Sequence, residues 1–126
     1  MEFFDYNGKG IWTADQIIRR YKKYCFKFNM EPRPDVKPQI YTDKDIQRSY
    51  PVMEKIISGI KDGDLACAQI GIEFIEEDQR FTFGAILKSN TARELRRCRG
   101  LTDAQKEQIR KRIVSFYQTG IVPREF

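Results

Sequence analysis

Two glutamates of this 126-residue chain have the spacing that acid–base or metal chemistry requires. Glu73 and Glu77 are four residues apart, so on a helix their carboxylates share one face. The chain contains no histidine, which removes the commonest general base, the commonest metal ligand and every nucleophile activated by an imidazole. We therefore interpret the pair as a solvated acidic face. We expect no catalysis, no cofactor and no metal site.

The segment Asn7–Gly8–Lys9–Gly10 contains the glycines that a phosphate-binding loop would need. Such a loop joins a strand to the start of a helix, and the residues around this segment do not show that order. No P-loop, dinucleotide fingerprint, paired-cysteine motif or calcium loop occurs elsewhere. We interpret the segment as a turn and expect no small-molecule ligand.

The strongest candidate for a binding surface is a basic cluster near the C-terminus. Residues 1–50 have a net charge of +3, residues 51–80 of −4 and residues 81–126 of +6. The candidate binding residues of the last segment are Arg93, Arg96, Arg97, Arg99, Lys106, Arg110 and Lys111.

This charge asymmetry allows two functions. The first is a non-enzymatic protein-binding module or small subunit of a larger assembly, because an acidic middle and a basic end favour self-association or a charged protein partner. The alternative is nucleic-acid binding, in which the basic residues would neutralise phosphates. No base-stacking aromatic residue is interleaved with them, and intrahelical ion pairs such as Glu107 with Lys111 would instead make a solvated face.

Apolar spacing and capping residues predict the helices that position these side chains. Thr13 with Gln16 and Thr102 with Gln105 are capping boxes, and Asp64 is a further helix cap. Thr42–Asp43–Lys44–Asp45 could start a short helix that runs towards Tyr50, or this helix could merge with the one after Pro51 through a kink. The predicted helices cover residues 13–28, 51–61, 65–77, 84–98 and 103–118.

Between the helices, prolines at positions 32, 34 and 38 predict an extended connector over 29–38. Residues 1–12 could form a β-hairpin around Asn7–Gly8 or an irregular segment that lies across the helices. We expect the aromatic residues of this segment, Phe3, Phe4, Tyr6 and Trp12, to fill the core together with Ile11.

The short breaks between the helices after Tyr50 predict antiparallel helical hairpins. In helix length and spacing, residues 50–120 resemble HEAT-like αα-hairpin repeat proteins, and the resemblance implies a binding scaffold without chemistry of its own. A compact helical bundle fits the same pattern. The expected fold is therefore all-α, with a possible N-terminal β-hairpin.

We expect one domain over residues 1–126, with an N-terminal arm, helix and connector over 1–38 and a helical core over 39–126. No apolar run approaches the ~20 residues needed to cross a membrane. The three cysteines are odd in number and widely spaced, which indicates reduced thiols. We expect a cytoplasmic protein without membrane contact.

Overall fold

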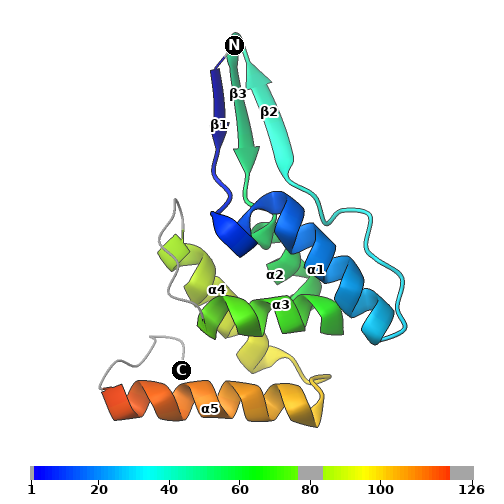
Figure 1. Ribbon diagram of the computed structural model, residues 1–126, viewed down its shortest axis with the longest axis vertical. Coiled ribbons are helices and arrows are strands. Elements are labelled where there is room, and N and C mark those ends of the chain that lie inside the picture. The colour runs from blue at the N-terminus through cyan, green and yellow to red at the C-terminus, as the bar shows by residue number, and fades with distance from the viewer. Residues whose placement is uncertain (1, 77–83, 120–126) are drawn as a thin grey trace.

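The computed structural model describes residues 2–76 and 84–119, and it is mainly helical with a small mixed sheet (Figure 1). The elements in chain order are β1 (Glu2–Asp5), the 3-10 helix η1 (Gly10–Trp12), α1 (Ala14–Lys27), β2 (Gln39–Asp43), β3 (Ile46–Tyr50), α2 (Met53–Lys61), α3 (Leu65–Glu76), α4 (Gly84–Arg97) and α5 (Asp103–Thr119). The helical part of the expected fold class is confirmed, and the expectation of an all-α protein is wrong.

The helix starts follow from the predicted caps. The Thr13 hydroxyl accepts the Gln16 N–H at 3.4 Å, and Thr102 and Gln105 cap each other reciprocally at 3.1 Å. The Asp64 carboxylate accepts the Cys67 N–H at 3.0 Å at the start of α3. Each of these side chains satisfies an N–H group that the first helical turn leaves unpaired.

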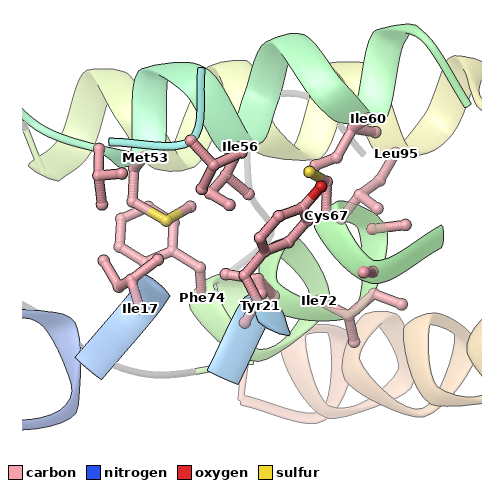
Figure 2. Packing of buried hydrophobic residues seen from close by; sticks show 14 of the residues in the cluster. Ile17, Tyr21, Met53, Ile56, Ile60, Cys67, Ile72, Phe74 and Leu95 are labelled. Atoms are coloured by element: carbon pink, nitrogen blue, oxygen red, sulfur yellow. The ribbon is translucent and has the colours of Figure 1, made fainter. Parts of the chain in front are cut away.

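Helix α3 lies at the centre of the helical part, because α1, α2, α4 and α5 all contact it. Its residues Ile72 and Phe74 are both fully buried, in agreement with the apolar residues that the sequence places on two sides of this helix. Figure 2 shows how side chains of α1, α2, α3 and α4 meet in this core. The labelled residues there are Ile17, Tyr21, Met53, Ile56, Ile60, Cys67, Ile72, Phe74 and Leu95. None of the helices that the structure describes is long and apolar enough to cross a membrane.

Residues 39–50 form a β-hairpin, so the predicted short helix after Thr42 is wrong. Strands β2 and β3 pair antiparallel from Gln39↔Tyr50 to Asp43↔Ile46. Lys44, in the two-residue loop between them, has a left-handed backbone with φ of 56°. Of the residues that suggested a helix start, Thr42 and Asp43 end β2, and Lys44 and Asp45 form the tight turn. The β-branched and aromatic residues on either side favour strands.

The N-terminal hairpin is also absent from the described residues, because β1 pairs parallel with β3, not with a neighbouring segment. The resulting sheet has the order β1-β3-β2. Trp12 is fully buried, as expected of a core residue, whereas Phe3, Phe4 and Ile11 are exposed. The expectation that all the N-terminal aromatic residues fill the core is therefore wrong.

Asn7 joins the sheet to the helical part. Its side-chain oxygen accepts the Val52 N–H at 2.8 Å, just before α2. Its amide nitrogen donates to Asp5 at 2.8 Å and, more weakly, to Ser49 and the Tyr50 carbonyl at 3.4 Å. The predicted Asn7–Gly8 turn therefore has a structural role, in which one buried side chain fixes the ends of β1 and β3 against α2.

The proline-containing connector between α1 and β2 is held by Arg33, which pairs with Asp62 at 2.8 Å and with Asp35 at 3.1 Å. The Arg33 N–H donates to the Tyr21 hydroxyl at 2.9 Å, and that hydroxyl donates to Asp64 at 2.8 Å. These bonds tie the connector to α1 and to the junction of α2 and α3.

Candidate binding surfaces

The three-stranded sheet extends away from the helices, with the N-terminus and the β2–β3 loop at its far end (Figure 1). Four large hydrophobic side chains are exposed on it: Phe3 is 56% exposed, Phe4 40%, Ile40 53% and Tyr41 57%. Because side chains alternate along a strand and the register is known, Phe4 and Tyr41 lie on one face, and Phe3 and Ile40 on the other. Both faces of the projecting sheet therefore present apolar surface.

Aromatic rings form a row on the face that carries Phe4 and Tyr41. The ring centroids of Tyr6 and Tyr50 are 5.5 Å apart, and those of Tyr50 and Tyr41 are 5.4 Å apart in an edge-to-face arrangement. The Arg48 guanidinium lies 5.9 Å from the Phe4 ring centroid. Where this face meets α2, a shallow depression of about 410 Å³ is lined by Gln39, Tyr41, Tyr50 and Glu54.

Both outer strands of the sheet have an open edge. Within the described residues, β1 and β2 each pair with β3 and with no other strand. The outward N–H and C=O groups of these two strands are therefore available to pair with another chain.

The predicted basic residues lie on α4, on α5 and on the connection between them. Arg93 is half-buried and donates to Asn90 at 3.4 Å, whereas Arg96 and Arg97 are exposed near the end of α4. Arg99 follows in the connection. Lys106, Arg110 and Lys111 are exposed on α5.

Arg97 and Arg110 each form an ion pair within their own helix. Arg97 pairs with Glu94 at 3.6 Å and Arg110 with Glu107 at 2.9 Å. The predicted partner of Glu107 was Lys111, but Glu107 pairs with Arg110 instead. Such exposed pairs contribute little to stability.

A second basic surface, on α1, was not among the candidate residues. Arg19, Lys22, Lys23 and Lys27 are all exposed and follow one stripe of the helix, with Phe26 between them at 91% exposure. None of the four cations has a carboxylate partner among the residues the structure describes. The i, i+3, i+4 spacing of these residues in the sequence places them on the face of the helix opposite its apolar residues.

Glu73, the described member of the predicted carboxylate pair, is tied into the fold. One carboxylate oxygen of Glu73 accepts a hydrogen bond from Arg20 of α1 at 2.6 Å. The other accepts hydrogen bonds from the Tyr24 hydroxyl and from the Gln69 side chain. Burial and the hydrogen bond to Glu73 raise the pKa of Tyr24 to about 12. Glu77 lies outside the described residues.

The network continues from Glu73 to α5. Gln69 donates to Gln108 at 3.3 Å and accepts from the buried Gln105 at 3.4 Å. Glu73 therefore belongs to a polar seam that joins α1, α3 and α5. No three side chains able to bind a metal ion together are found in the described part of the chain.

Comparisons of the chain with protein-family models, with curated proteins and with solved structures found no match.

Proposed function

We propose that the chain is a non-enzymatic protein-binding module, or a small subunit of a larger assembly, that docks through its projecting sheet. The observation that carries this proposal is the exposure of Phe3, Phe4, Ile40 and Tyr41 on strands whose outer edges are open. Fully burying one such side chain contributes about 1.5–3 kcal/mol. Large apolar side chains that are exposed together on one projecting element favour a protein–protein contact.

A second candidate function is nucleic-acid binding through the basic helices, and a separate observation favours it. Arg99, Lys106 and Lys111 have no carboxylate partner among the described residues, and neither do the four cations of the α1 stripe. Such cations can neutralise phosphates without first breaking an internal ion pair. The aromatic rings of the sheet lie on strands with a net negative charge, which disfavours the sheet itself as the nucleic-acid surface.

Affinity capture with a tagged chain separates the two functions. The capture is run at low and at moderate salt, with and without nuclease. A protein partner that survives nuclease and moderate salt supports docking through the sheet, because apolar contacts are insensitive to salt. Loss of all bound material on nuclease treatment, with a steep fall in binding as salt rises, supports nucleic-acid binding.

We also propose a reducing compartment, the cytoplasm, as the location of the chain. Cys25, Cys67 and Cys98 are free thiols, and the first two are buried in the core. Thiols packed in this way are typical of proteins that do not need disulfides for stability.

A further inference from the structure

We propose that two copies of this chain pair their β2 strands antiparallel about a two-fold axis at Tyr41. Each copy contributes the three strands β1-β3-β2, so pairing at β2 makes one continuous sheet of six strands. The proposal rests on the proposed function, because it names a second copy of the chain as the protein that docks at the edge of the projecting sheet.

The two open edges of the sheet differ in how well they resist pairing. Proteins protect an open edge with charged residues, proline or a bulge. β1 has a carboxylate at each end, Glu2 and Asp5. β2 has the sequence Gln-Ile-Tyr-Thr-Asp, with no lysine or proline and one charge at its end. β2 is therefore the less protected edge. Its middle residues are exposed, so a second chain can reach it.

The register of the pairing follows from the length of the strand. Antiparallel self-pairing that uses all five residues of Gln39–Asp43 places Tyr41 opposite its own copy. Ile40 then lies opposite Thr42, and Gln39 opposite Asp43, so no like charges face each other. The same pairing of β1 would place Glu2 opposite Asp5 twice, which is destabilising.

The side chains of β2 are suited to this register. Residues directly opposite on neighbouring strands have Cβ atoms about 4.5–5.5 Å apart, so the two Tyr41 rings would meet and extend the row of Tyr6, Tyr50 and Tyr41 into the second copy. The Tyr41 hydroxyl donates to the Gln39 side-chain oxygen at 2.9 Å. That bond leaves the Gln39 amide nitrogen to donate to Asp43 of the second copy.

Charge at the ends of β2 favours the same arrangement. The exposed Lys37 lies two residues before the strand, and Asp43 and Asp45 lie at its other end. Antiparallel pairing brings the Lys37 end of each copy beside the acidic end of the other, twice per dimer. The outer edges of the six-stranded sheet would be the two β1 strands, whose carboxylates oppose further growth, so the assembly closes at two copies.

The mass of the full chain in solution, measured by sedimentation over a concentration series, tests the pairing. We expect the wild-type chain to approach twice its monomer mass of 14.9 kDa. Tyr41→Lys places two like charges on the two-fold axis and should be monomeric at the same concentrations. Ile86→Lys changes a similarly exposed apolar residue on α4, outside the sheet, and should stay dimeric. Circular dichroism melts of all three chains confirm that each is folded.

A covalent trap gives a second readout that does not depend on loss of binding. In a Cys98→Ser background, Tyr41→Cys should form an intermolecular disulfide under mild oxidation, because opposite Cα atoms are about 4.5–5.5 Å apart, within disulfide range. Ile86→Cys should not, because Ile86 is exposed on α4 and lies outside the sheet. A monomeric wild-type chain, or a Tyr41→Lys chain that stays dimeric, overturns the proposal. If a monomeric wild-type chain still captures another protein through its sheet, the proposed function stands and the self-pairing is wrong.

Discussion

Gly59 of α2 lies directly against Cys67 of α3. A Cβ atom added at Gly59 would be 2.3 Å from the Cys67 Sγ and 3.0 Å from its Cβ. The contact is reciprocated further along, where a Cβ at Gly71 of α3 would be 2.6 Å from the Ile60 Cδ1 of α2. The two helices that carry most of the core can approach this closely because each presents a glycine to the other.

This contact predicts that Gly59→Ala destabilises the protein in spite of the better helix propensity of alanine. The added methyl group overlaps a fully buried sulfur atom, and overpacking of a core costs about 1–3 kcal/mol. In a Cys67→Ala background the sulfur atom is gone, so the same substitution should cost less. Urea unfolding of the two single variants and the double variant measures the coupling. Additive effects would show that the glycine is not needed for the close approach.

The sequence predicted the helices better than the sheet, and the reason is physical. Capping boxes such as Thr102 with Gln105 are local, so their two residues identify a helix start without any tertiary information. The pairing of β1 with β3 joins Phe3 to Gln47, which are far apart in the chain, and no local signal reveals such a partner. The antiparallel arrangement of the helical hairpins and the single-domain organisation stay predictions.

For the candidate binding surfaces too, some features could be predicted from the sequence and others could not. The exposure of Arg96, Arg97 and Lys111 followed from the charge pattern. The exposure of Phe3 and Tyr41 did not, because an aromatic residue in a short strand is more often part of the core.

Asn7→Ala should loosen the junction between the sheet and the helices. The substitution leaves the buried Val52 N–H without its acceptor and removes the bonds to Asp5 and Tyr50. An unsatisfied buried group of this kind costs about 1–3 kcal/mol. Gln47→Ala is the matched control, because the only side-chain bond of Gln47 in the described residues is an exposed one of 3.5 Å to Thr42. Equal unfolding free energies for the two variants would contradict the role given to Asn7.

Thiol labelling should distinguish the three cysteines. Burial raises the pKa of the Cys25 and Cys67 thiols, and the nearby Asp64 carboxylate raises both further. Both thiols are therefore protonated and inaccessible in the folded chain, whereas Cys98 is partly exposed. We expect one fast-reacting thiol in the native protein and three after unfolding. Fast labelling of Cys67 under native conditions, identified by peptide mass, would contradict the packing of α2 against α3.

Stability should fall in alkali because of Tyr24. Its folded-state pKa of about 12 lies above the ordinary tyrosine value of 10.0, so the folded chain holds this proton more tightly than the unfolded chain does. The resulting stability is complete below pH 10 and is lost as the pH rises towards 12. Tyr24→Phe should be less stable than wild type at pH 7, because the hydrogen bond to Glu73 is gone. In urea unfolding, the unfolding free energy of Tyr24→Phe should also fall less steeply with pH above pH 10 than that of wild type. An equally steep fall in the two chains would contradict this assignment.

The central claim is that the projecting sheet is the docking surface, and a quantitative capture assay with two matched double variants tests it most directly. Phe3→Thr with Ile40→Thr removes exposed apolar surface from one face of the sheet and keeps β-branched residues in the strands. Arg96→Glu with Arg97→Glu reverses two exposed charges on α4. Both variants should melt near the wild-type temperature, since exposed positions contribute within ~0.5 kcal/mol.

With nucleic acid removed by nuclease, we expect the sheet variant to capture no protein partner and the arginine variant to capture as much as wild type. The opposite pattern, with capture retained by the sheet variant and lost by the arginine variant, would contradict the claim and place the binding surface on the basic helices.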